Sequence, residues 1–247
     1  MDFFYQDLRT YIDPSEEMKL YRAAYPLPPR LIYSPFNRPE IEKKRLKGKI
    51  TELPRLNRGT HLYCLNDEVL YFQGLMGAPV AAIFIERLIA LGIQEIIFLG
   101  LAGGIQDVSV GDRVLVTEAL RFEGTSFHYL PANIQCFPSK ELTNDLEQFC
   151  MNKELSFTKG KVCSTDARFR ETFDLVRYLC KRKVLAIEME VSAVFAIAIF
   201  RQVQASAIVI ISDELKDEKW DISEPLTYSK PYFTSFEFLV EFLSQRG

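Results

Sequence analysis

The stretch Val184-Leu185-Ala186-Ile187-Glu188-Met189-Glu190, followed by the apolar residues 191–200, decides the fold class. Its first four residues predict a buried strand, and residues 191–200 predict a helix. The next apolar run, residues 205–211, predicts another strand and ends at Ser212-Asp213. In an open α/β sheet, residues just past the carboxyl ends of strands face the ligand crevice. Two strand ends that carry carboxylates are therefore predicted at such a crevice.

Strand-like and helix-like segments alternate outward from this stretch. Strands are predicted at residues 31–33, 69–72, 96–99 and 114–117, and helices at residues 40–47, 80–91, 173–183 and from residue 231 onward. The glycine-rich residues 100–105 are expected to form a loop. Residues 1–30, rich in Tyr and Pro, are expected to form an irregular N-terminal extension that packs on the body or on a neighbouring subunit. The alternation predicts a single α/β domain with a central mixed sheet flanked by helices.

Composition narrows the class of function. The chain has 247 residues, a hydrophobic fraction of 48% and a formal net charge of -3, which suits one domain with a sizeable core and gives no support for nucleic-acid binding. No apolar run is long enough for a membrane span, and the first ten residues lack a signal-peptide pattern. The five cysteines are scattered without metal-binding spacing, which favours a reducing cytoplasm and predicts no metal site.

Several blocks, taken in order, resemble the nucleoside phosphorylase / uridine phosphorylase superfamily. They are Gly77-Ala78-Pro79, the stretch 100–105 with Gly111-Asp112, the stretch 121–129 (Arg-Phe-Glu-Gly-Thr-Ser-Phe-His-Tyr), Thr165-Asp166-Ala167, the stretch 188–193 (Glu-Met-Glu-Val-Ser-Ala), and Ser212-Asp213. The resemblance covers residues 31–240. It implies a three-layer sandwich, with residues 31–247 as the catalytic domain, and cleavage of a nucleoside N-glycosidic bond. It also implies a homo-oligomer (a dimer or hexamer) and inorganic phosphate as co-substrate, with no other cofactor.

Glu190 matches the glutamate with which the family binds ribose. An ionised carboxylate accepts two hydrogen bonds, which is what a 2′,3′-diol offers. Met189 matches the residue that packs on the sugar, and Glu188 is the second carboxylate of the motif. The alternative is that Glu188 and Glu190 only cap the following helix, whose N-terminus favours negative charge.

Asp213 matches the acid that protonates the purine N7 in purine-cleaving relatives. Burial at a strand end raises the pKa of a carboxyl group and makes it a usable general acid. A turn-forming Asp is the alternative. The stretch 123–129 is closer to the uridine phosphorylases, which typically lack this acid, so the base stays undecided between purine and pyrimidine.

The resemblance assigns further substrate contacts to polar and aromatic side chains on three segments. Arg168, Phe169 and Arg170 fall in the loop where the family holds an aromatic under the base and polar groups that recognise it. Arg121, Thr125 and His128 lie in the stretch 121–129, and Gly103 lies in the glycine-rich segment. For Arg121 and His128, a solvated or structural role is an equal alternative. Trp220 is either part of a lid over the base or a packing anchor.

The phosphate site departs from the family pattern. The first phosphate loop corresponds to residues 34–38, so that Ser34 and Arg38 are the predicted contacts. A second arginine of the family falls on Phe98, and a phosphate-binding threonine falls on Leu101. The amides from Gly100 onward, with Arg58 or Arg55 from a neighbouring subunit, are expected to supply the remaining donors. Loss of two charge-assisted or hydroxyl donors weakens phosphate binding.

Three functions follow from these residues. The first is phosphorolysis of a nucleoside to free base and ribose 1-phosphate. The second is hydrolysis of the same bond, favoured by Phe98 and Leu101. The third is a non-catalytic nucleoside-binding protein, because fold alone does not establish chemistry. Glu190 and Asp213 favour an enzyme, with phosphorolysis ahead.

Overall fold

The structure is a computed structural model that describes residues 9–24, 27–36, 49–50, 61–222 and 224–246. Its elements, in chain order, are α1 (Pro14–Ala24), β1 (Arg30–Ser34), β2 (Lys49–Ile50), β3 (His61–Cys64), β4 (Val69–Gln73), α3 (Ala78–Ala90), β5 (Glu95–Gly104), β6 (Arg113–Phe122), η1 (Thr125–His128), α4 (Lys140–Asn152), β7 (Thr158–Thr165), η2 (Arg168–Arg170), α5 (Phe173–Lys181), β8 (Val184–Glu188), α6 (Val191–Arg201), β9 (Gln204–Lys216), β10 (Lys219–Ile222) and α7 (Pro225–Gln245). The predicted helix at 40–47 lies outside the described residues.

The strands form one mixed sheet in the order β10-β9-β6-β7-β8-β5-β1-β4-β3-β2, with β9 also paired to β5. Because β9 pairs with β6 near its middle and with β5 along most of its length, the strands β5, β9, β6, β7 and β8 close into a ring. Strands β1, β4, β3 and β2 extend the sheet from β5, and β10 pairs with the far end of β9. The predicted central mixed sheet is confirmed.

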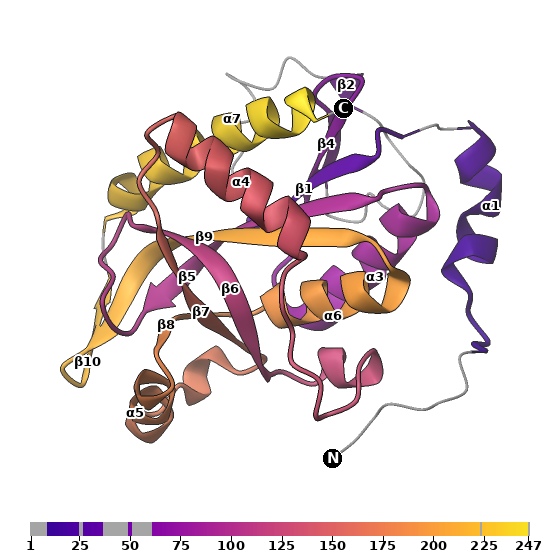
Figure 1. Cartoon of the computed structure of the whole chain (residues 1–247). Coiled ribbons are helices and arrows are strands. Elements are labelled where there is room, and N and C mark those ends of the chain that lie inside the picture. The colour runs from indigo at the N-terminus through magenta and orange to yellow at the C-terminus, as the bar shows by residue number, and fades with distance from the viewer. Residues whose placement is uncertain (1–8, 25–26, 37–48, 51–60, 223, 247) are drawn as a thin grey trace.

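Helices cover both faces of the sheet (Figure 1). Helices α3 and α6 lie on one face and α4 and α7 on the other. Alternation along β5 shows why both faces are covered: Phe98 belongs to the core under α3 and α6, while Ile97 and Leu99 belong to the core under α4 and α7. A strand that is apolar on both sides needs two helical layers, so the three-layer architecture follows from the sequence of β5.

The N-terminal segment contains a helix where an irregular extension was expected. Helix α1 begins after Asp13, whose Oδ1 accepts hydrogen bonds from the amides of Ser15 and Glu16. This is an N-capping arrangement, with a proline in the first turn. The helix packs on α3, where Met18 is fully buried and Glu17 pairs with Arg87 at 2.8 Å.

Two strands run further than expected, and this changes the surroundings of the site. Strand β5 continues through the glycine-rich residues to Gly104, because β9 supplies backbone partners along that length. Strand β9 continues to Lys216 and turns back into β10 at Asp217 and Glu218, both with positive φ. The charged residues 214–221 therefore belong to a β-hairpin. Helix α7 also begins earlier than expected, at Pro225 rather than Pro231, because Pro225 occupies its first turn.

Candidate active site

A cavity of about 220 Å³ opens at the end of β8, beside the last residues of β5 and residues 212–213 of β9. Its walls come from the β8–α6 junction, from β5 and β9, from the η2 segment and from the start of α7. The lining residues are Phe36, Met76, Leu101, Ala102, Gly103, Arg168, Glu171, Ile187, Glu188, Met189, Glu190, Ser212, Asp213, Ile222 and Tyr228. Glu188, Glu190 and Asp213, which the sequence singles out, therefore lie at one cavity. Asp213 lies within β9, three residues before this strand ends at Lys216, rather than at a strand end as predicted.

Glu190 stands at the N-cap position of α6 and lines this cavity with a side chain that is only 2% exposed. Its Oε1 accepts a hydrogen bond of 2.5 Å from the amide of Gly77. Burial, reinforced by the negative charge of Glu188, raises the pKa of Glu190 to about 8, against the backbone amides of Gly77 and Met189. No described basic side chain forms an ion pair with it. The carboxylate thus faces the cavity without a counter-charge that would neutralise it.

Glu188 has a different set of partners. Its Oε2 accepts the amides of Glu190 at 2.6 Å and of Val191 at 2.8 Å, which caps α6. Its Oε1 accepts the hydroxyl of Ser164. Burial raises the pKa of Glu188 to about 7, although these hydrogen bonds oppose the shift. The helix-capping alternative therefore describes the contacts of Glu188, even though the residue also lines the cavity.

Asp213 lies on β9 beside Gly103 of β5. Its Oδ1 accepts the hydroxyl of Ser212 at 2.6 Å, and its Oδ2 accepts the indole N–H of Trp220 at 2.7 Å. The guanidinium of Arg168 stacks over the ring of Trp220 at 5.3 Å from its centroid. Trp220 is therefore held within the β9–β10 hairpin by its hydrogen bond to Asp213.

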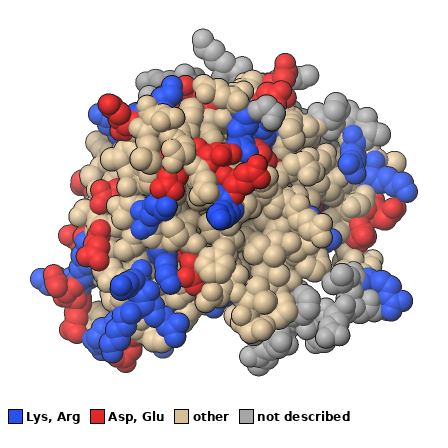
Figure 2. Space-filling model, viewed as in Figure 1, with Lys and Arg blue, Asp and Glu red and all other residues tan. Residues whose placement is uncertain are grey.

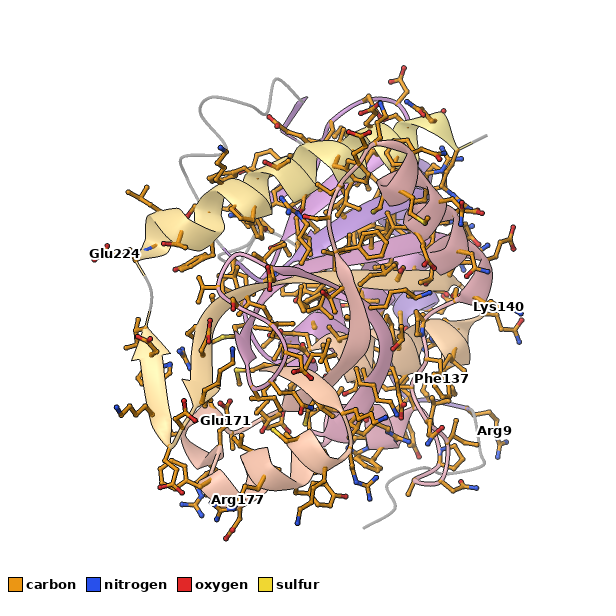
Figure 3. The ribbon with its side chains drawn as sticks, turned by 60° about the vertical axis from the view of Figure 1, so that its left-hand side comes forward. Arg9, Phe137, Lys140, Glu171, Arg177 and Glu224 are labelled. Carbon is orange, nitrogen blue, oxygen red and sulfur yellow. The ribbon has the colours of Figure 1, made fainter. Side chains whose placement is uncertain are left out.

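Glu171 is a carboxylate of the cavity that the sequence did not indicate. It follows η2, is partly buried, and lies between α5 and the β9–β10 hairpin (Figure 3). Burial and the charge of Asp213 raise the pKa of Glu171 to about 7, and Arg168 opposes this shift. The only signal in the sequence was its place in the polar segment after a strand end.

Several predicted substrate contacts are not brought to the cavity. Phe169 is 93% exposed, and neither it nor Arg170 lines the space, because the η2 turn directs Arg168 and Glu171 inward instead. Thr125 and the exposed His128 lie on η1, also outside the lining.

Arg121 has a structural set of contacts. Its guanidinium donates to the hydroxyl of Ser126 and to the carbonyls of Leu130, Pro131 and Ile134, and it lies over the ring of Phe127. These bonds fix the loop that follows β6. Its donors are consumed there, in agreement with the structural alternative.

The predicted phosphate contacts are likewise used in packing. The hydroxyl of Ser34 bonds to that of Tyr232 at 2.6 Å in the buried core. Gly100 sits in β5, and a Cβ on it would lie 2.4 Å from the ring of Phe98, so the glycine is required by packing. Arg38, Arg55 and Arg58 lie outside the described residues. Among the described lining residues, Arg168 is the one cation, and it stands beside Trp220.

The family model of the phosphorylase superfamily matches residues 34–230. The chain belongs to the phosphorylase superfamily. This confirms the family predicted from the ordered blocks, and most of the three-layer domain lies inside the match.

Known members of the superfamily differ in the base they act on. The chain is 32% identical over 141 residues to a guanosine phosphorylase of Halorubrum lacusprofundi, covering 57% of this chain and 58% of that protein. It is 30% identical over 148 residues to a uridine phosphorylase of Treponema pallidum, covering 55% and 57% respectively. The matched region thus spans less than two thirds of the length of these relatives.

Solved structures share the superfamily fold over nearly the whole chain. A purine nucleoside phosphorylase from Toxoplasma gondii in complex with immucillin-H superposes with a TM-score of 0.78 at 16% identity, covering 97% of both chains. An AMP nucleosidase from Bacteroides thetaiotaomicron superposes with a TM-score of 0.75 at 19% identity, covering 94% of this chain and 97% of the other. At such identities the likeness shows the fold alone.

The cavity also contains apolar residues that the superfamily blocks do not include. Phe36, Met76, Ile222 and Tyr228 come from four separate segments and meet only through the tertiary fold. Met76 had one available signal, since it directly precedes the block Gly77-Ala78-Pro79. Ile222 and Tyr228 do not directly follow any strand that the apolar pattern of the sequence predicts.

The surface agrees with the near-neutral charge of the sequence. On the face seen in Figure 2, acidic and basic side chains intermingle, and the basic ones are densest at lower left, over α5. Among the described helices, none combines the length and apolar character required to span a bilayer.

Proposed function

We propose that this chain cleaves the N-glycosidic bond of a nucleoside and transfers the pentosyl group to inorganic phosphate, releasing free base and ribose 1-phosphate. The observation that carries this proposal is the carboxylate of Glu190, buried at the wall of a cavity that Asp213 of β9 also lines. Membership in the phosphorylase superfamily supports the same reaction class.

The sugar is assigned to the β8–α6 side of the cavity. There Glu190 accepts hydrogen bonds from the 2′ and 3′ hydroxyls, and Met189 and Met76 pack on the ring. As the glycosidic bond breaks, positive charge develops at C1′ and the ring oxygen, and a carboxylate in a poorly solvated wall stabilises that charge more than water does. The base is assigned to the opposite side, next to Asp213 and Arg168.

Hydrolysis is the second candidate, and β5 supplies the observation that favours it. The amides expected to hold phosphate belong to a strand paired with β9, and Phe98 and Leu101 stand where the superfamily has polar donors. The matching fold of an AMP nucleosidase is consistent with a hydrolytic member. Arg38 and Arg58 remain the proposed phosphate ligands of the first candidate, Arg58 from a neighbouring subunit in a homo-oligomer.

One assay separates the candidates. The purified protein is incubated with guanosine, inosine, adenosine or uridine, with and without phosphate, while free base, ribose and ribose 1-phosphate are quantified. Ribose 1-phosphate formed only with phosphate supports phosphorolysis, and ribose formed without phosphate supports hydrolysis. A Glu190→Ala variant purified in parallel controls for contaminating host enzymes. Equal product from both proteins, or no product from any nucleoside, would refute the proposed activity.

A further inference from the structure

The base side of the cavity contains two carboxyl groups, and their hydrogen bonds differ. Both oxygens of Asp213 already accept hydrogen bonds, from Ser212 and from Trp220. This arrangement suits an ionised carboxylate, which can only accept. The carboxyl group of Glu171 has no hydrogen-bond partner among the described residues and lines the same cavity.

The surroundings of Glu171 favour its protonated form near neutral pH. It is partly buried, the negative charge of Asp213 lies nearby, and together these raise the pKa of Glu171 to about 7. Arg168 acts in the opposite direction but is itself stacked on Trp220. A proton donor works best when its pKa is near the working pH, so Glu171 combines access to the cavity with a transferable proton.

Resting on the proposed function, we propose that Glu171, and not Asp213, donates the proton to the departing base, and that the base is a purine. As the C1′–N9 bond breaks, its electron pair passes to the purine, and the O–H of Glu171 transfers its proton to the imidazole nitrogen N7. The base then leaves neutral and Glu171 becomes a carboxylate. The nucleophile, phosphate or water, forms the new C1′–O bond with an oxygen lone pair and releases one proton, which restores Glu171 through solvent.

Asp213 has a positioning role in this scheme. Its bonds to Ser212 and Trp220 tie the β9–β10 hairpin to the cavity, and its charge keeps the proton on Glu171. A carboxylate beside a carboxylic acid is a known means of setting two acids to different protonation states.

The test compares guanosine with 7-methylguanosine, whose base already carries a positive charge and leaves without a proton. We expect Glu171→Gln to lower kcat/KM for guanosine at pH 7 by roughly 100-fold or more, within the usual contribution of general acid catalysis. We expect the same variant to cleave 7-methylguanosine within about threefold of the wild type, since that step needs no acid. Glu218→Gln is the matched control, because Glu218 lies at the turn of the neighbouring β9–β10 hairpin, outside this cavity, and pairs with Arg177.

Each outcome decides the matter. If Glu171→Gln slows both nucleosides equally, Glu171 acts by positioning and the inference is wrong; the same holds if it slows neither. If the wild type cleaves uridine but neither guanosine nor 7-methylguanosine, the proposed function survives and the purine assignment fails. If the wild type cleaves no nucleoside, the proposed function itself fails, and this inference fails with it.

Discussion

Two buried glutamates at the β8–α6 junction illustrate how neighbouring residues acquire different roles. Both carboxylate oxygens of Glu188 accept hydrogen bonds, from the amides of Glu190 and Val191 and from the hydroxyl of Ser164. Glu190 accepts from the amide of Gly77 and faces the cavity. The motif predicted that this pair belongs to a ligand site, but it could not divide the roles, because that division depends on Ser164 and Gly77 from distant segments. The sequence did not indicate Glu171 either, because this residue meets the other lining residues only through the tertiary fold.

Replacing Glu188 tests its capping role. In Glu188→Ala the amides of Glu190 and Val191 and the hydroxyl of Ser164 lose a buried acceptor, so we expect the free energy of unfolding to fall by about 2–3 kcal/mol. Urea denaturation of Glu188→Ala and Glu190→Ala measures the difference. An equal or larger loss in Glu190→Ala would contradict the assignment.

The pH dependence of kcat/KM reports the ionisation of Glu190 and Glu171 in the free enzyme. Glu190 accepts the diol when ionised, with a pKa raised to about 8, and Glu171 donates when protonated, with a pKa raised to about 7. We therefore expect kcat/KM to rise up to about pH 7, to be greatest between about pH 7 and 8, and to fall above. The alkaline fall should vanish in Glu171→Gln. A profile flat from pH 6 to about pH 9 would be incompatible with these roles.

At the scale of elements, the sequence predicts those helices and strands whose side chains form a clear apolar pattern. Strand β8 and helix α6 were predicted within one residue, because continuous apolar runs define them. The second half of β5 was expected as a loop, since its glycines carry no side chain pattern, and its strand state depends on pairing with β9. Helix α1 is not predicted from the sequence, although Asp13-Pro14 marks its start, because most of its described residues are polar or exposed and Met18 is the one among them that is fully buried.

Replacing Gly100 tests whether this glycine is required for packing or for binding phosphate. A Cβ at this position would meet the ring of Phe98, so we expect Gly100→Ala to lower the free energy of unfolding by about 1–3 kcal/mol through overpacking. Combining it with Phe98→Leu should recover part of that loss. Thermal and urea unfolding of the single and double variants measure both effects. Unchanged stability with a raised KM for phosphate would instead support the amide-binding prediction.

At the scale of the whole molecule, the acidic cavity couples ligand chemistry to stability. Glu188 and Glu190 have pKa values of about 7 and about 8 in the folded chain, above the ordinary 4.5. Between the ordinary pKa of 4.5 and the raised values of about 7 and about 8, the unfolded chain binds fewer protons than the folded chain. Rising pH therefore favours unfolding over this range. The site thereby opposes stability at the pH at which it is proposed to act, a trade often found at functional sites.

This coupling predicts that the free energy of unfolding depends measurably on pH. We expect the free energy of unfolding to decrease from pH 5 to about pH 8, by on the order of 1 kcal/mol per pH unit for each fully buried carboxyl. Glu190→Gln removes one such group and should flatten the decrease. Urea denaturation at pH 5, 6, 7 and about 8 provides the values. A free energy of unfolding that does not decrease over this range in the wild type would show that folding does not raise the pKa of these two carboxyls.

The proposed grip of Glu190 on the sugar diol is tested most directly with a ribonucleoside that the wild type cleaves and its 2′,3′-dideoxy counterpart. We expect Glu190→Gln to lower kcat/KM for the ribonucleoside by roughly 100-fold or more, since two hydrogen bonds to a charged group are weakened. For the dideoxy nucleoside, which lacks both hydroxyls, variant and wild type should agree within about threefold. An equal loss on both substrates, or no loss on the ribonucleoside, would contradict the assignment of Glu190 as the ligand of the sugar.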